Sequence, residues 1–389
     1  MRVNPGGMLS PAEVVGRDLL IKKLWRILER QSLVLTAERR MGKTSIVKKM
    51  TSESANDAIA IYRDLEGIKT AADFARRVLE DVEGYLSRFG KGAVKVRALL
   101  KSLTGVEIAG VLKLPERAEA HWNDVLQRTM EDLLDHQDRP VIFFWDELPL
   151  MLYDIKKQQG ETVAQEILDL LRSLRQTHVN LRMVFTGSIG LHNVLTTLKR
   201  SGYANDPTND MKTVDVPPLS QIDAEDLVRR LMVGEGLAIE AELTVQEIAT
   251  AADCIPFFIH QLIDHLVDSE AEGESINIPA VVKQYMLDPQ DPWHLRYYRE
   301  RIDSYYLKDD RAIALALLDI LALATQPISF DDLFNRVQSQ TDAFDAESVR
   351  DVLTLLQRDH YVEQADVNAF RFRFALIQQS WLIHRGLAA

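Results

Sequence analysis

Hydrophobic residues in the first half of the chain fall into short apolar runs separated by stretches of helical spacing. Residues 32–36 and 141–145 are continuous apolar runs, as expected of buried parallel strands. Similar spacing arguments predict further strands at 58–62 and 181–185, and helices at 18–30, from about 44, at 71–88, 118–136 and 162–177. Strands that alternate with helices predict an α/β fold, a parallel sheet flanked by helices.

Residues 90–116 interrupt this alternation. Glycine and proline gather there, at Gly90, Gly92, Gly105, Gly110 and Pro115. Because these residues favour turns, the segment is predicted to be an insertion that contains a short hairpin.

The pattern becomes wholly helical after residues 216–218, Val-Pro-Pro. Helices are expected at 222–234, 244–252 and 256–268, followed by a linker marked by Pro279, Pro289 and Pro292. The last 80 or so residues predict helices at 310–324, 329–338 and 345–359 and a hairpin of 361–363 with 370–374. Three helices and a two-stranded wing predict a winged helix-turn-helix.

Charge is distributed unevenly along the 389 residues. The net charge is −12, from 46 basic and 58 acidic residues, which excludes a polybasic nucleic-acid or membrane-surface protein. Residues 1–50 nevertheless hold 11 basic and 4 acidic residues, a net of +7, so the remainder carries −19. A basic N-terminal segment on an acidic protein suits an anionic ligand.

Cysteine content and hydropathy bear on the compartment. The single cysteine, Cys254, excludes an internal disulfide and a multi-cysteine zinc site. No apolar run approaches the roughly 20 residues of a membrane-spanning helix, and no signal sequence is recognisable. We therefore expect a cytoplasmic protein without a membrane partner.

The strongest chemical signal is Ala-Glu-Arg-Arg-Met-Gly-Lys-Thr-Ser at residues 37–45, between a predicted strand and a predicted helix. This is the context of a P-loop, in which backbone N–H groups and a helix N-terminus surround phosphates. Lys43 would neutralise the β- and γ-phosphates, and Thr44 would ligate Mg²⁺. Ala37 stands where the pattern has its first glycine. The predicted nucleotide-binding residues of the loop are Arg39, Arg40, Met41, Gly42, Lys43, Thr44 and Ser45.

A second signal is the apolar strand that ends in Asp146 and Glu147, the arrangement of a Walker B motif. Asp146 is predicted to hold Mg²⁺, directly or through water, and Glu147 to act as general base toward the attacking water. Solvated acids that merely end a strand are the alternative, but the upstream P-loop favours the functional interpretation.

A polar turn, Thr186-Gly187-Ser188, ends the strand predicted at 181–185. Ser188 and Thr186 are candidates to contact the γ-phosphate or the attacking water. The alternative, that the turn only ends the strand, has equal weight.

The sequence resembles the STAND-class and archaeal-type ATPases, which are AAA-like. The resemblance is carried by Val14-Val15-Gly16-Arg17-Asp18, by the Arg-Arg-x-Gly-Lys-Thr-Ser wording of the P-loop, by the Thr-Gly-Ser turn, by Ile255-Pro256 and by the aromatic segment 372–382. It implies that Val15, Gly16 and Arg17 contribute to the adenine side of the site.

The same resemblance implies an ATP-binding, ATP-hydrolysing molecular switch of three domains: a P-loop domain (1–215), a helical lid (216–300) and a winged helix (301–389). Turnover is expected to be slow and regulated by a partner or effector protein. If the protein forms a homo-oligomer, an arginine finger is expected in trans, with Arg200 of the Lys199-Arg200 pair as candidate and Arg172 and Arg175 as runners-up. Solvated helix charges are the alternative.

DNA is a possible partner that the charge pattern does not favour. Residues 310–389 hold 7 basic and 11 acidic residues, a net of −4, which suits protein contact better than phosphate contact. The alternative function is a DNA-associated ATPase similar to replication initiators or transposition regulators, with Lys22, Lys23, Arg26 and Arg30 supplying the contact. A third possibility is a module that binds nucleotide only for structure, against which Glu147 speaks.

Overall fold

The computed structural model describes residues 1–54, 58–88, 93–104, 119–135, 137–237, 242–272, 277–340 and 344–387. They divide into two compact units. The first, here called the sheet unit, comprises Leu19–Thr36 and Lys43–Asp215. The second, here called the helical unit, comprises Met1–Asp18, Ala37–Gly42 and Val216–Ala389. The six-residue loop Ala37–Gly42 thus groups with the helical unit, although the segments on either side of it belong to the sheet unit.

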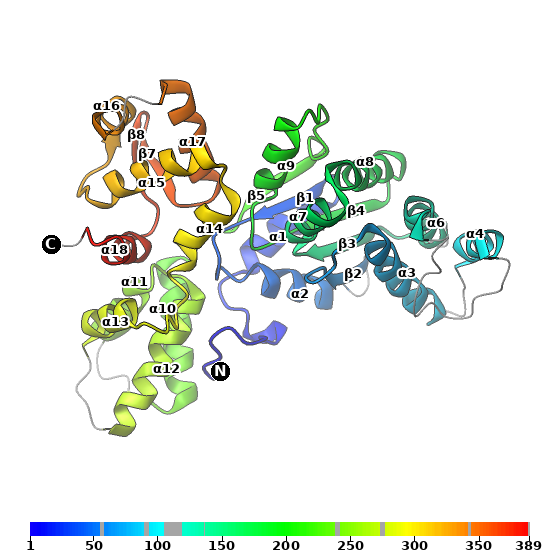
Figure 1. Cartoon of the computed structure of the whole chain (residues 1–389). Helices are drawn as coiled ribbons and strands as arrows, with labels where there is room; N and C mark the ends of the chain where they lie inside the picture. Colours follow the sequence, from blue (N-terminus) through cyan, green and yellow to red (C-terminus); the bar gives the residue numbers. More distant parts are fainter. Residues whose placement is uncertain are drawn as a thin grey trace. The chain divides into compact units, whose positions relative to one another are not determined.

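The sheet unit is built on five parallel strands in the order β2-β3-β4-β1-β5 (Figure 1). Their bounds are β1 (Ser32–Thr36), β2 (Ile59–Asp64), β3 (Val141–Asp146), β4 (Leu181–Phe185) and β5 (Met211–Asp215). The predicted parallel sheet is therefore confirmed. The edge strand β5 was missed by pattern analysis because, in Met-Lys-Thr-Val-Asp, only the first and fourth side chains are buried.

Helices cover both faces of this sheet (Figure 1). They are α1 (Asp18–Leu28), α2 (Lys43–Glu53), α3 (Ala71–Ser87), α6 (Trp122–Leu134), α7 (Leu148–Gln159), α8 (Glu161–Thr177) and α9 (Leu191–Arg200). The helix α4 (Val94–Thr104) packs against α6. Successive side chains of a strand point to opposite faces. Phe144 accordingly meets Trp25 of α1 at 6.3 Å between ring centroids, and Trp145 meets Phe74 of α3 at 5.3 Å.

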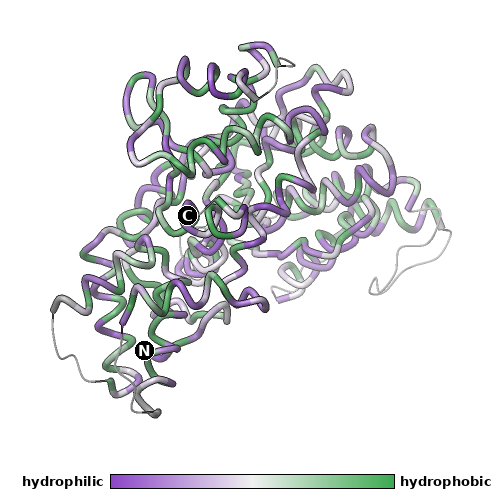
Figure 2. Tube along the Cα trace, turned by 60° about the vertical axis from the view of Figure 1, so that its left-hand side comes forward, coloured by the Kyte–Doolittle hydropathy of each residue, from purple (hydrophilic) through white to green (hydrophobic). Residues whose placement is uncertain are grey.

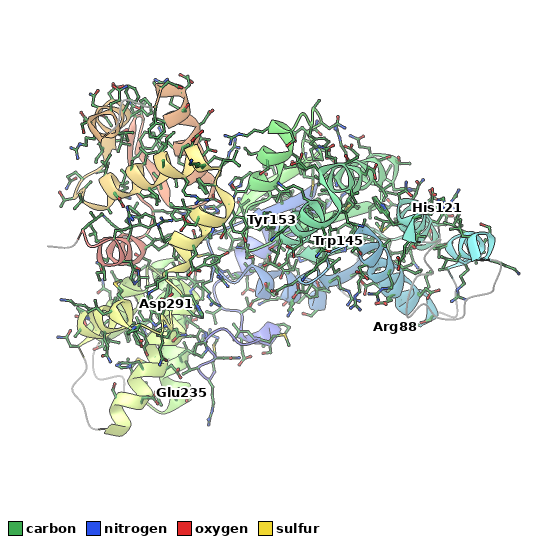
Figure 3. All side chains as sticks on the ribbon, viewed as in Figure 1. Arg88, His121, Trp145, Tyr153, Glu235 and Asp291 are labelled. Atoms are coloured by element: carbon green, nitrogen blue, oxygen red, sulfur yellow. The ribbon has the colours of Figure 1, made fainter. Side chains whose placement is uncertain are left out.

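The centre of the core is β3, whose six residues are all buried. Trp145, labelled in Figure 3, is fully buried and also stacks on Phe185 of β4 at 6.1 Å. A strand buried on both faces reads as one apolar run, which is why this segment was predicted correctly. Truncating such an aromatic residue typically costs about 3–5 kcal/mol.

The hairpin expected within 90–116 is wrong for the part that the structure describes, since Val94–Thr104 forms the helix α4. The glycines and the proline that suggested turns lie outside the described residues. The buried carboxylate of Asp132 accepts the N–H groups of Lys95 and Val96, both at 2.8 Å, and thereby caps the first turn of α4. Because this cap comes from α6, the local sequence gives no sign of it.

The helical unit contains the remaining elements. The helices are α10 (Gln221–Glu235), α11 (Glu242–Ala251), α12 (Pro256–Glu272), α13 (Ile278–Leu287), α14 (Tyr297–Tyr305), α15 (Lys308–Ala322), α16 (Phe330–Gln340), α17 (Ala346–Arg358) and α18 (Ala375–His384), with one 3₁₀ turn, η1 (Pro11–Glu13). Figure 2 shows hydrophobic and hydrophilic residues alternating along the helices, as expected for helices with one buried face. In the described ranges, no helix is both long and apolar enough to cross a bilayer.

Three short strands accompany the last helices. They are β6 (Ile328–Ser329), β7 (Val362–Asp366) and β8 (Ala369–Phe372), which pair antiparallel in the order β6-β8-β7. The predicted hairpin is present as β7 and β8, and β6 adds a strand that its two residues were too short to reveal.

The linker predicted around Pro279 is wrong at its start. Pro279 lies in the first turn of α13, where the side chain of Asn277 accepts the N–H of Ala280 at 3.1 Å. Proline is compatible with a first turn because the N–H that it lacks has no partner within the helix there.

A half-buried aspartate, Asp253, joins the start of α18 to the turn after α11. The Asp253 carboxylate accepts the N–H of Leu376 at 2.7 Å, and burial raises the pKa of Asp253 to about 6. The folded chain therefore binds the proton more tightly than the unfolded chain does. For such a group, the free energy of unfolding falls as the pH rises from about 4 to about 6.

We expect the substitution Asp253→Asn to flatten this pH dependence, because the amide still accepts the N–H of Leu376 but does not titrate. The difference between wild type and variant should change by about 3 kcal/mol between pH 4 and pH 7. The measurement is the denaturant midpoint at several pH values, with the exposed Asp309→Asn as control. Parallel pH profiles for wild type and Asp253→Asn would contradict the prediction.

Candidate nucleotide-binding site

The loop Ala37–Gly42, which connects β1 to α2, has two residues in the left-handed region, Arg40 at φ 73° and Gly42 at φ 84°. Ala37 is not among the described residues with positive φ, so alanine fits where the P-loop pattern has glycine. Left-handed residues in a loop turn successive N–H groups inward, which creates an anion-binding concavity. A side-chain carbon at Gly42 would meet no atom within 4 Å, so the loop is open at that point.

Gly16 allows a close approach within the helical unit. Its φ is 68°, and a side-chain carbon there would lie 2.6 Å from Cβ of Asp223. Neither the backbone conformation nor the space admits a larger residue. Val15, which precedes it, is half-buried. The contact of Val15 and Gly16 with adenine stays a prediction.

Arg17 contacts the loop itself. Its buried guanidinium donates to the carbonyl oxygens of Met41 at 3.0 Å and Pro217 at 2.8 Å. Burial lowers the pKa of Arg17 to about 10, so it remains charged at neutral pH. Arg17 therefore anchors the loop through the backbone of Met41.

The side chains of Arg39 and Arg40 lie against aromatic rings of the helical unit. The Arg39 guanidinium is 4.1 Å from the ring centroid of Tyr297, and that of Arg40 is 4.1 Å from the ring of Phe257. Burial lowers the pKa of Arg40. Cation–π contacts of this kind contribute about 0.5–2 kcal/mol each. These two contacts attach loop side chains to α14 and α12.

Glu38 is a residue of the loop whose role the sequence analysis did not identify. It is 1% exposed, and its carboxylate pairs with the Arg301 guanidinium at 3.1 Å. The same oxygen accepts the N–H of Arg39 at 2.7 Å. The sequence did offer one signal for such a role. An acidic residue stands inside a basic loop, where contact with a phosphate would not explain it.

In the sheet unit, oxygen atoms converge on Asp146 at the end of β3. The Thr44 hydroxyl donates to the Asp146 carboxylate at 2.6 Å, the Thr186 hydroxyl at 3.3 Å and the Tyr62 hydroxyl at 3.4 Å. Asp146 is 3% exposed. Thr186 reaches it because β4 is the neighbour of β3 in the sheet. A hydroxyl and a carboxylate side by side fit the oxygen-ligand preference of Mg²⁺.

Lys43 and Ser45 flank Thr44 in the first turn of α2. Lys43 is 8% exposed, and Ser45 is half-buried. The N-terminus of α2 is the positive end of the helix, and Lys43 is its first residue. The contact of Lys43 and Ser45 with phosphate stays a prediction.

Glu147 adopts a left-handed conformation, with φ 57° and ψ 24°, just before α7. Such a conformation costs a non-glycine residue about 1–3 kcal/mol and is often found at functional sites. The Glu147 carboxylate accepts both the N–H and the hydroxyl of Ser188, at 3.0 and 2.8 Å. Burial raises the pKa of Glu147, and the bonds from Ser188 act in the opposite direction. Ser188 thus touches the candidate base directly.

The candidate finger arginines differ in their surroundings. Arg175 is buried, pairs with Asp210 at 2.8 Å and donates to the carbonyl oxygen of Pro207 at 2.6 Å, so it is held inside the sheet unit. Arg200 is exposed at the end of α9, and Arg172 is half-buried on α8. Of the three, Arg200 keeps the accessibility that a trans-acting residue needs.

Part of the chain is similar to a known family, and the whole chain is similar to known structures. Residues 27–195 match the family of AAA domains. A Walker-type ATPase of Pyrococcus abyssi is similar in structure, with 15% identity, coverage of 98% of this chain and 99% of that chain, and a TM-score of 0.69. The ORC2 protein of Aeropyrum pernix, solved as ADPNP–ADP complexes, gives 14% identity, 96% and 95% coverage and a TM-score of 0.54.

Comparison with curated protein sequences finds no match. At such low identity, the structural likeness establishes the fold alone. The family match covers the P-loop from Ala37 to Ser45 and the acidic end of β3. Residues 27–195 are therefore similar to AAA domains, and the chain has the fold of archaeal Walker-type and ORC-type ATPases.

Proposed function

We propose that this protein binds ATP with Mg²⁺ and hydrolyses it, as a slow molecular switch that acts on a partner protein. The observation that carries the proposal is the pairing of Thr44 with Asp146 at 2.6 Å, next in sequence to a half-buried Glu147 that Ser188 orients. A module that binds nucleotide only for structure has no need of the Glu147–Ser188 pair.

The roles of the side chains follow from phosphoryl-transfer chemistry. Lys43 neutralises β- and γ-phosphate oxygens, and Thr44 and Asp146 hold the metal ion. Bound Mg²⁺ offsets the negative charge on the phosphates. Glu147 accepts a proton from the water whose oxygen bonds to the γ-phosphorus, while the bond from that phosphorus to the bridging oxygen breaks and ADP leaves.

The strained position of Glu147 supports its role as general base. Desolvation brings the pKa of its carboxyl upward, toward the working pH, where a base is most effective. Ser188 limits this rise, because hydrogen bonds to a carboxylate favour the ionised form.

The architecture suits a STAND-type switch of three domains, divided at about residues 215 and 300. The order α15, α16, α17 and then the β7–β8 hairpin supports a C-terminal winged helix. The net charge of −4 over residues 310–389 favours a protein partner over DNA. We place the protein in the cytoplasm. In a homo-oligomer, Arg200 would supply the finger to a neighbouring nucleotide.

DNA association is the second candidate function, and α1 is the observation that favours it. Lys22, Lys23 and Arg26 are exposed along α1, while Ile21, Leu24 and Leu28 are buried. Exposed Arg30 follows the helix. This face could track a phosphate backbone.

The first test separates binding from turnover. Lys43→Ala should abolish ATP binding measured by calorimetry, because the γ-phosphate charge is no longer offset. Glu147→Gln should keep binding but reduce phosphate release roughly 10²–10⁴-fold. Lys157→Ala and Glu166→Gln, at exposed positions on α7 and α8, are matched controls. Unchanged turnover in Glu147→Gln would remove the base assignment.

A second test uses the pH dependence of hydrolysis. Glu147 must be ionised to accept a proton, so the rate should rise with pH through its pKa. Ser188→Ala removes a hydrogen bond that lowers this pKa, so the acidic limb of the pH–rate profile should move to higher pH. If the limb stays in place while the rate falls at every pH, Ser188 does not act through Glu147.

The DNA hypothesis is tested by charge reversal on α1. The triple variant Lys22→Glu, Lys23→Glu, Arg26→Glu should weaken binding of a labelled duplex in fluorescence anisotropy and reduce the salt slope by about 1 per lost phosphate contact. Lys156→Glu with Lys157→Glu on α7 is the control. Absence of duplex binding by the wild type at low salt, with ATP present, would exclude this function.

A further inference from the structure

Arg301 of α14 lies between two carboxylates in the interior of the helical unit. Its guanidinium donates to Glu38 of the phosphate-binding loop at 3.1 Å and to Asp359, which follows α17, at 2.9 Å. The three residues are 5%, 1% and 2% exposed. One cation therefore connects the loop with the C-terminal helices away from water.

The end of α17 fixes the position of Asp359. His360 is left-handed, with φ 66°, and the N–H groups of Tyr361 and His360 donate to the carbonyl oxygens of Leu356 and Gln357 at 3.0 and 3.1 Å. These two hydrogen bonds form a Schellman motif at the C-terminus of α17. It leaves Asp359 facing α14.

Both oxygens of Asp359 have partners. One accepts from Arg301, and the other accepts the Tyr306 hydroxyl at 2.7 Å. The aromatic ring of Tyr361 lies 5.5 Å from the Arg301 guanidinium, and its hydroxyl donates to the carbonyl oxygen of Tyr298 at 2.7 Å. Contacts with Asp359 and Tyr361 thus fix the Arg301 guanidinium independently of Glu38.

On the other side, Glu38 transmits the position of Arg301 to the loop backbone. The carboxylate oxygen that receives Arg301 also accepts the N–H of Arg39. The two following residues, Arg40 and Met41, are held by Phe257 and Arg17. A displacement of Arg301 therefore acts on a loop whose conformation is otherwise restrained.

Stability alone does not account for these contacts. Removing three charged groups from water costs several kcal/mol per ion, and apolar residues of similar volume often stabilise a core better. A buried ion network of this kind fixes one geometry in preference to others. The geometry fixed here is that of the phosphate-binding loop.

We propose that Arg301 is a positioning residue for nucleotide binding, which holds the loop through Glu38 and makes its conformation depend on Asp359 and the C-terminal helices. The inference rests on the proposed nucleotide binding. Because coupling between two sites is reciprocal, a change at Asp359 must alter nucleotide affinity, and nucleotide must alter the segment around Asp359.

The first experiment compares two isosteric substitutions in the intact chain. Asp359→Asn should weaken binding of ADP with Mg²⁺ at least about 5-fold in calorimetry, and raise the KM for ATP with little change in kcat. Asp319→Asn is the matched control, since Asp319 pairs with Arg385 at 2.6 Å and accepts the Trp381 indole N–H in the same C-terminal segment, apart from the loop. Asp319→Asn should change the affinity for ADP and the KM for ATP by less than about twofold.

Glu38→Gln provides the second arm. It should raise the KM for ATP as Asp359→Asn does, and the double variant should lose less than the sum of the two, because both substitutions disrupt one network. Equal losses in Asp319→Asn and Asp359→Asn, or additive losses in the double variant, would overturn the proposal.

Hydrogen exchange on the wild type covers the case in which a variant does not fold. Adding ADP with Mg²⁺ should slow exchange of the amides at 355–362 and leave those around Asp319 unchanged. Measured ADP binding without any change at 355–362 would overturn the inference and leave the proposed function standing. A wild type that binds neither ADP nor ATP would instead refute the proposed function.

Discussion

The chemistry of the sheet unit depends on one buried carboxylate, that of Asp146. A charged group at 3% exposure must be compensated, and here the compensation comes from the hydroxyls of Thr44, Thr186 and Tyr62. These hydroxyls belong to α2, to the end of β4 and to β2, so the strand order β2-β3-β4-β1 is what brings them together. The need to satisfy Asp146 therefore links the fold of the sheet to the proposed metal site.

The adjacent Glu147 illustrates how backbone strain and burial can serve function. A glutamate in the left-handed region is unfavourable, as is a desolvated carboxylate. Gly187 makes the arrangement possible, since a side-chain carbon there would lie 2.7 Å from Cδ of Pro149. Two hydrogen bonds from Ser188 to the Glu147 carboxylate offset part of this cost.

The phosphate-binding loop is restrained by side chains that no P-loop pattern contains. Arg17, Phe257, Tyr297 and Arg301 all contact Ala37–Gly42, and all belong to the helical unit. The loop therefore has the flanking segments of the sheet unit as covalent neighbours and the helical unit as packing partner.

The sequence by itself determined the parallel α/β fold, the P-loop and the acidic strand end, since each follows from local periodicity or from a short motif whose chemistry is contained within it. Tertiary structure alone decided the rest. The helix α4 depends on Asp132, 37 positions from Lys95, and the partner of Glu38 lies 263 positions away. The guanidinium groups of Arg39 and Arg40 stack on aromatic rings, which the sequence pattern did not indicate, and the contact of these residues with nucleotide stays a prediction. Such pairings depend on which faces of the helices and strands pack together, and the pattern of residues along the chain does not indicate this.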